Sequence, residues 1–246
     1  MLKPTQSLYL LLKSRKMKKG IIIIMLGLLA LSLAGESNCE VYIPIEVGTK
    51  ITYQNFNHKD KLEGTQKMEI KSVEKGENKL SITAHMELLD DKGEMTYDDD
   101  FKYYCENGIF HIDMENMLPA ETMEAYKDME VSVEQSELTI PASIEPGMTL
   151  DDAKLTMKVS TNGIAIMSMD VNITDRKIEA KETITTEAGS FECYKLTYNT
   201  SSKMGFVNVS TSSIEWFSPN VGMVRSETYD KKGKLESYSV LTSLTK

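Results

Sequence analysis

Residues 79–88 read KLSITAHMEL, with polar and apolar side chains alternating at every position. Successive side chains of a β-strand point to opposite faces, so this segment would bury Leu80, Ile82 and Ala84 on one face and keep the other face in water. Strands with one wet face are typical of antiparallel sheets, because strands of parallel sheets are buried on both sides. The segment therefore predicts a strand of an antiparallel sheet.

The same alternation recurs through the chain and predicts about a dozen strands. The further segments are 50–56, 66–73, 101–105, 109–114, 154–160, 164–173, 177–186, 191–198, 204–216, 222–229 and 235–244. Polar turns join several of them, as at Asp90–Gly93, Asn107-Gly108 and Asp230–Gly233, and such residues tolerate the positive φ of tight hairpins. No repeat of fixed period occurs, which argues against a solenoid or a propeller.

Residues Pro119–Glu130 break the alternation. They read PAETMEAYKDME, with an early proline, acidic residues in the first turn and apolar residues three apart, which predicts one short amphipathic helix. Residues 140–152, with two prolines and a glycine, predict an irregular connection. Because no low-complexity linker separates the two groups of strands, we expect residues 35–246 to form a single antiparallel β domain.

The N-terminal 34 residues have the layout of a leader. Residues 17–34 read MKKGIIIIMLGLLALSLA, which is a cationic start, an apolar run and a small-residue end, as in a secretory signal peptide. The apolar run is shorter than the roughly 20 residues that cross a bilayer as a helix, so we expect cleavage before Gly35 and no stable membrane span. An uncleaved anchor is the alternative, and the true start, Met1 or Met17, stays open.

Removing residues 1–34 takes away six basic and no acidic residues, leaving 22 basic and 37 acidic residues and a net charge of −15. A surface of this charge repels phosphate backbones and anionic lipid headgroups, which argues against nucleic-acid binding and membrane-surface docking. The simpler interpretation is that the negative charge serves only to keep the protein soluble.

Three cysteines follow the leader: Cys39, Cys105 and Cys193. An oxidising compartment permits one disulfide and leaves one thiol. We favour Cys105–Cys193, since both lie in predicted strands, although spacing does not fix the connectivity. Cys39 follows Glu36-Ser37-Asn38 rather than the small residues that precede an acylated cysteine, so we do not expect a lipoprotein.

The sequence contains few candidates for catalytic residues. His58, His85 and His111 have no partner at metal-ligand or triad spacing, and no phosphate loop, zinc cluster or nucleophile elbow occurs. The acidic residues between Asp90 and Asp100 fit no calcium loop, and we interpret them as a solvated hairpin. We therefore expect no enzyme, no cofactor and no metal.

Three segments resemble a family of uncharacterised bacterial secreted proteins called TapB-like. They are residues 41–44 together with 47–53, residues 188–196 and residues 214–227, which read VYIP with VGTKITY, AGSFECYKL and IEWFSPNVGMVRSE. The resemblance implies an exported protein with a strongly curved antiparallel sheet or half-barrel, as in periplasmic lipoprotein carriers, with one or two short helices. It implies no activity and no site residues, and the chain departs from those carriers in having little predicted helix.

These observations lead to the hypothesis of a non-enzymatic periplasmic or secreted protein that binds a lipid or another apolar ligand on the concave face of the sheet. The candidate pocket residues are Tyr103, Phe110, Met123, Tyr126 and Trp216, which could equally form the core. The alternative is an envelope interaction or assembly module that pairs with a partner protein through exposed strand edges.

Overall fold

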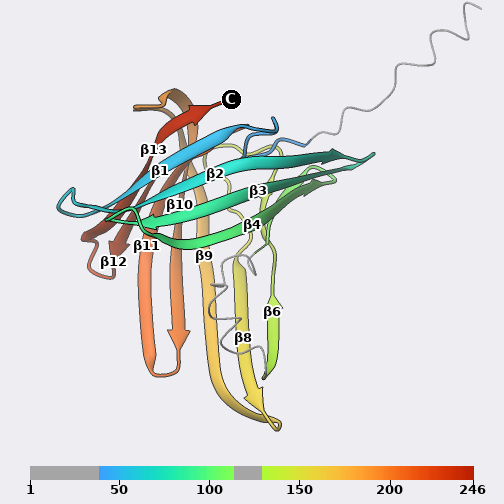
Figure 1. Ribbon diagram of the computed structural model, residues 1–246, viewed down its shortest axis with the longest axis vertical. Helices are drawn as coiled ribbons and strands as arrows, with labels where there is room; N and C mark the ends of the chain where they lie inside the picture. Colours follow the sequence, from blue (N-terminus) through green and yellow to red (C-terminus); the bar gives the residue numbers. More distant parts are fainter. Residues whose placement is uncertain (1–38, 114–128) are drawn as a thin grey trace, which may run out of the picture. The chain divides into compact units, whose positions relative to one another are not determined.

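The computed structural model describes residues 39–113 and 129–246, and thirteen β-strands make up its regular structure (Figure 1). The strands are β1 Lys50–Asn57, β2 Leu62–Lys75, β3 Lys79–Asp90, β4 Met95–Glu106, β5 Ile109–Ile112, β6 Glu130–Gln135, β7 Leu138–Pro141, β8 Ala153–Thr161, β9 Ile164–Thr186, β10 Gly189–Met204, β11 Val207–Ser218, β12 Gly222–Asp230 and β13 Leu235–Thr245. Within these two ranges there is no helix, and therefore none that could span a membrane.

All thirteen strands belong to one antiparallel sheet, in the order β6-β8-β9-β10-β11-β12-β13-β1-β2-β3-β4-β5-β7. The sheet is open, and β6 and β7 are its two edges. This confirms the predicted fold class of a mostly β protein built on an antiparallel sheet. The helix expected over Pro119–Glu130 lies outside the described residues up to position 128, and Glu130 itself begins β6.

The two edge strands are neighbours in sequence, and this fixes the curvature of the sheet. Only Ser136 and Glu137 separate the end of β6 from the start of β7, so three Cα–Cα steps of about 3.8 Å each join the opposite edges. Ser136 donates its backbone N–H to the carbonyl of Lys154 on β8 (2.8 Å), and the Glu137 carboxylate contacts Nδ1 of His111 on β5 (2.8 Å). The sheet must bend until its edges meet this short link.

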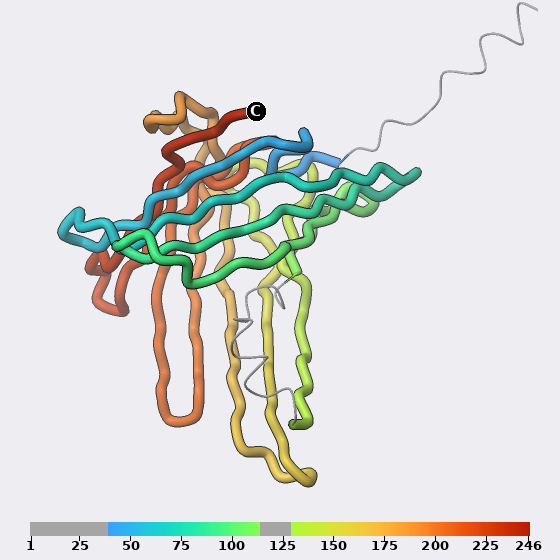
Figure 2. The backbone as a smooth tube through the Cα atoms, in the orientation of Figure 1, coloured from blue at the N-terminus to red at the C-terminus, as the bar shows by residue number. Residues whose placement is uncertain are grey.

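Bending brings distant strands of the sheet against one another. Figures 1 and 2 show β1–β4 running across the long strands β9–β11. One cluster of buried side chains draws on both groups, from Ile51, Ile70 and Ile82 to Leu196 and Phe217. A second, smaller cluster lies on β8 and β9, around Leu155, Met157 and Val159. The inner face of the sheet is therefore the core.

A β-bulge in β9 explains why its sequence predicted two strands. Thr174 pairs with Asn199 and Lys177 pairs with Thr197, so Asp175 and Arg176 together lie opposite one residue. Asp175 has a φ of 55°, in the left-handed region that a bulge of this kind uses. The extra residue shifts the alternation, so that odd-numbered residues such as Ile173 face inward before the bulge and Arg176 and Ile178 face inward after it.

The bulge turns Arg176 into the protein, where only 1% of it is exposed. Its Nη1 donates to the carbonyl of Asp151 (2.6 Å) and its Nη2 to the carbonyl of Thr139 in β7 (3.0 Å). The cost of burying a guanidinium is thereby offset by hydrogen bonds to backbone oxygens. Arg176 thus joins β9, the third strand from one edge of the sheet, to β7 at the other edge.

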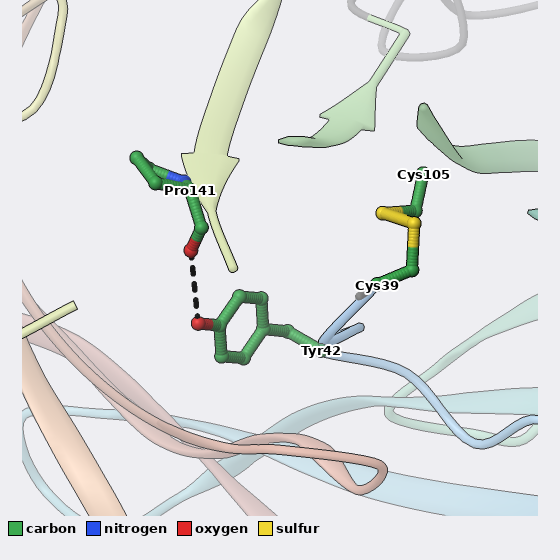
Figure 3. The surroundings of a disulfide bond; sticks show 4 residues. All are labelled: Cys39, Tyr42, Cys105 and Pro141. Atoms are coloured by element: carbon green, nitrogen blue, oxygen red, sulfur yellow. Dashed lines mark hydrogen bonds between the residues drawn. A yellow bond between two sulfur atoms is a disulfide. The ribbon is translucent and has the colours of Figure 1, made fainter. Parts of the chain in front are cut away.

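The segment before β1 is fastened by the disulfide, which joins Cys39 to Cys105 (Figure 3). Beyond Cys39, Val41, Tyr42 and Ile43 are buried, and the Tyr42 hydroxyl donates to the carbonyl of Pro141 (3.3 Å). The segment therefore packs into the main core before the first strand begins.

The predicted Cys105–Cys193 pair is wrong, and Cys193 is a buried free thiol. Cys105 shares the inner face with its pairing partner Phe110, whereas Cys193 lies three residues from the inward-facing Leu196 and so points to the other face of β10. Cys39, which precedes the first strand, is free to reach Cys105. The two strands therefore hold Cys105 and Cys193 on different faces of the sheet, and the two sulfur atoms cannot bond.

We expect the denatured protein to expose one reactive thiol without reductant and three after reduction, with a proteolytic peptide linking Cys39 and Cys105. Changing both to serine should lower the free energy of unfolding by about 2–4 kcal/mol, measured by urea titration of Trp216 fluorescence. Cys193→Ala is the control that keeps the disulfide. A linked peptide containing Cys193 would contradict the assignment.

Replacing the buried guanidinium should be costly. Arg176 also interacts electrostatically with the buried carboxyl group of Glu215 on β11. We expect Arg176→Met to lower the free energy of unfolding by about 3–5 kcal/mol, because it leaves two carbonyls and Glu215 without their positive partner. Adding Glu215→Gln to Arg176→Met should recover part of that loss. The exposed neighbour is the control, since Lys177→Met should change stability by less than about 0.5 kcal/mol. Equal effects of the two single variants would show that Arg176 has no special role.

Candidate functional site

A cavity of about 270 Å³ opens on the inner face of the sheet. Strands β1, β2, β4, β5, β7, β11 and β12 contribute to its wall, together with the segment before β1. Most of the lining side chains are apolar or aromatic, and five of them carry rings: Tyr42, Tyr53, Tyr103, Phe110 and Phe217. The cavity is thus a concave, largely apolar space of the kind that holds small ligands.

The rings pack against one another and give the wall a defined shape. Tyr42 meets Phe217 edge-on, with ring centroids 4.9 Å apart, and Phe110 edge-on at 5.9 Å. Tyr103 stacks on Phe110 at 6.1 Å. Such arrangements are favoured by the ring quadrupoles. Burial raises the pKa of Tyr103 to about 12 and that of Tyr53 further, so both hydroxyls stay neutral over the physiological range.

One carboxyl group breaks the apolar lining. Glu215 on β11 faces the cavity beside Phe217, and burial raises the pKa of its carboxyl group, while the Arg176 guanidinium and a hydrogen bond from Tyr198 act in the opposite direction. Glu215, Tyr198 and Arg176 form a polar layer on the inner face. A carboxylate here can accept a hydrogen bond from a hydroxyl or amino group of a ligand.

The polar layer lies between the two apolar clusters of the inner face. Leu196 and Ile178 belong to the main cluster, and Ile173 belongs to the second. Tyr198 contacts both clusters. The cavity therefore has an aromatic wall with this polar layer at its boundary.

The five residues proposed from sequence fall in different places. Tyr103 and Phe110 line the cavity, whereas Met123 and Tyr126 lie outside the described residues. Trp216 does not line it. Trp216 alternates with Glu215 and Phe217 and so points to the opposite face of β11, where its indole N–H donates to Glu182 and the Lys195 ammonium lies 5.4 Å from its ring.

Sequence reasoning missed Tyr42, Tyr53, Glu215 and the buried Arg176. Tyr42 precedes the first alternating segment, so no periodicity marked it. The phase of the alternation in Ile214-Glu215-Trp216-Phe217 was ambiguous, because both faces carry a large apolar residue. Choosing Phe217 instead of Trp216 as the inward side chain would have placed Glu215 on the inner face as well.

Two of the histidines contact acidic residues at the surface. His85 contacts Asp98 through Nε2 (3.0 Å) and Asp100 through Nδ1 (2.9 Å), so this part of the acidic segment packs around a neighbouring side chain. Over residues 39–113 and 129–246, no group of three His, Cys, Asp or Glu side chains is placed to hold a metal ion.

Two solved structures share this fold. A protein of Bacteroides fragilis, classed provisionally as exported and described as having a YmcC-like fold, superposes with a TM-score of 0.69 at 24% identity, covering 85% of this chain and all of that one. A protein of Parabacteroides distasonis, classed provisionally as a lipoprotein, gives 0.68 at 28% identity, covering 84% and 99%. Since one of these relatives is described as a lipoprotein, the comparisons give no support to our expectation that this chain is not lipidated.

No curated protein matches the chain. A family profile does, over residues 46–241, which include every strand from β1 to most of β13. The match does not extend to the TapB-like group that the sequence resembles. On this match the chain is a member of the DUF3108-like family.

Proposed function

We propose that the protein is exported to the cell envelope and there binds an apolar ligand, such as part of a lipid, in the inner-face cavity, without catalysing a reaction. The observation that carries this proposal is the ring-lined cavity with the single carboxyl group of Glu215 at its wall. Ligand sites are usually apolar clefts in which a few polar groups fix the orientation of the ligand.

The size of the cavity limits the ligand. About 270 Å³ lies just below the roughly 300–1,000 Å³ of pockets that enclose drug-sized molecules. The cavity therefore suits a small apolar molecule or one segment of a larger lipid. A hydroxyl or amino group on the ligand would find an acceptor in Glu215.

The proposed compartment rests on three supports. Residues 17–34 have the layout of a signal peptide. The Cys39–Cys105 disulfide is of the kind that persists in oxidising compartments. The two structural relatives are described as exported and as a lipoprotein. Within the DUF3108-like family, we place the chain with the TapB-like proteins on the segments it shares with them.

The alternative function, strand pairing with a partner protein, would use the free sides of β6 and β7. Both edge strands are short, at six and four residues, β6 carries Glu130 and Glu134, and β7 ends in Pro141. Short, charged or proline-bearing edges resist pairing with other chains. We therefore keep ligand binding as the leading proposal.

Ligand binding can be tested by blocking the cavity at its partly exposed residue Met223. We expect saturable binding of a fluorescent fatty-acid probe to the wild-type protein, and Met223→Trp should weaken it at least tenfold because the larger ring occupies the ligand's space. Native mass spectrometry of protein taken from its own envelope should show a mass above that of the polypeptide.

Met95→Trp provides the matched control, since Met95 is an exposed methionine at the start of β4 and does not line the cavity. It should bind the probe as the wild type does. Equal probe affinity in the wild type and Met223→Trp, together with a bare polypeptide mass, would refute the proposal.

The state of Cys39 can be read from the mass of the exported protein. A sulfur bonded to Cys105 cannot also carry a lipid, so the disulfide and lipidation exclude each other at this residue. We expect a chain that begins at Gly35, lacks acyl groups and contains one disulfide. A chain that begins at Cys39 with attached acyl groups would show that the protein is a lipoprotein.

A further inference from the structure

Exposed apolar side chains gather at the ends of two hairpins, β8–β9 and β10–β11. Phe206 is fully exposed, and Ile164 and Val207 are exposed by 69% and 59%. Half of the twelve large apolar side chains that are exposed in the described part of the chain lie here. We call these six the tip surface: Ile164, Ile166, Met204, Phe206, Val207 and Val209.

Strand pairing places the end of the β10–β11 hairpin beside β9, near the end of the β8–β9 hairpin. Met204 of β10 pairs with Met169 of β9 on one side and with Val207 of β11 on the other. The backbone N–H of Gly205 donates to the carbonyl of Ser168 (3.4 Å). Figure 2 shows both hairpins extending to the same side, away from β1–β4. The tip surface is therefore a projecting end of the sheet.

The local turn places Phe206 at the end of the β10–β11 hairpin. Met204 and Val207 pair directly, so Gly205 and Phe206 form a two-residue hairpin loop. Gly205 has a φ of 59°, which a glycine adopts without strain at the first position of such a loop. The short loop leaves the Phe206 ring with no neighbour to pack against, and it meets water on all sides.

The tip surface lacks the acidic residues that dominate the rest of the chain. Residues 159–169 carry no charge, and residues 199–213 carry only Lys203, in a protein with 37 acidic residues. The acids nearest in the described pairing are Asp170, opposite Lys203, and Glu130, opposite Ser160. The repulsion from lipid headgroups expected of the whole chain is thus weakest at this end.

An apolar, nearly uncharged projection with an aromatic ring at its end suits a lipid bilayer better than a protein. Protein interfaces combine apolar contact with about one hydrogen bond per 100–200 Å², whereas the side chains of the tip surface offer no hydrogen-bonding group. Apolar and aromatic side chains partition into the boundary between headgroups and acyl chains. Large exposed apolar patches on soluble proteins commonly mark such contacts.

We propose that the tip surface inserts into the interfacial region of a lipid bilayer and so docks the protein on the membrane. The inner face also links the tip to the cavity, because Val207 and Val209 alternate along β11 in phase with Glu215 and Phe217. Docking nevertheless does not depend on the cavity holding a ligand, and it can be tested when the cavity is empty or blocked.

Co-sedimentation of the exported protein with phosphatidylcholine vesicles tests the proposal. We expect the wild type to bind and the double variant Phe206→Ser/Val207→Ser to bind at least about tenfold more weakly, since two apolar side chains are lost. Binding should change little between low and high salt, because the contact is apolar rather than ionic. Met95→Ser, which removes an exposed methionine outside the tip surface, should bind as the wild type does.

A reporter at the tip distinguishes insertion from other modes of attachment. In Phe206→Trp, we expect brominated phosphatidylcholine to quench the fluorescence of the new tryptophan, whereas the buried Trp216 of the wild type should be unaffected. Unchanged melting temperatures would show that the variants fold. Failure of the wild type to bind vesicles, equal binding by the double variant, or an unquenched tryptophan at position 206 would overturn the proposal. Because Met223→Trp leaves the tip intact, it should bind vesicles normally, which separates docking from ligand binding.

Discussion

The link of Ser136 and Glu137 between the two edges of the sheet is the constraint on which the rest of the structure depends. A thirteen-stranded sheet whose first and last strands are two residues apart cannot stay flat. Its inner face must become concave, and the apolar side chains of that face must meet across the bend. The main core, the cavity and the buried segment before β1 all follow from this closure.

Closure also explains why a charged residue lies in the centre of the protein. Bending the sheet brings the backbone of β7 to the inner face, and edge strands have carbonyl groups without a partner. Arg176 donates to the carbonyl of Thr139 and, through its other nitrogen, to that of Asp151. A guanidinium is suited to this because its donors form a rigid fork and it remains charged. The β-bulge at Asp175 is the local device that aims it inward.

Local patterns predicted most of the strands, because period-two alternation is a property of each segment alone. The turn at Asp90 shows the same locality, since its carboxylate accepts the N–H groups of Lys92 and Glu94. Strands β6 and β7 escaped detection because they are short, at six and four residues, and because β6 begins at the end of the predicted helix and β7 ends in Pro141. Of the five proposed pocket residues, Tyr103 and Phe110 line the cavity and Met123 and Tyr126 lie outside the described residues. Trp216 was assigned to the wrong face, since the phase of an alternation does not show which face is concave. Arg176 could not be predicted, because its burial depends on carbonyls 25 and 37 residues away.

The disulfide joins the first and second of the three cysteines in sequence order, and the third is a free thiol. If the chain crosses a membrane from its N-terminus, as we propose, Cys39 and Cys105 would meet an oxidant before Cys193 does. Pairing in order of emergence then yields the native bond directly, without later exchange of partners. Cys193, which is enclosed when β10 joins the sheet, is removed from reaction by folding itself.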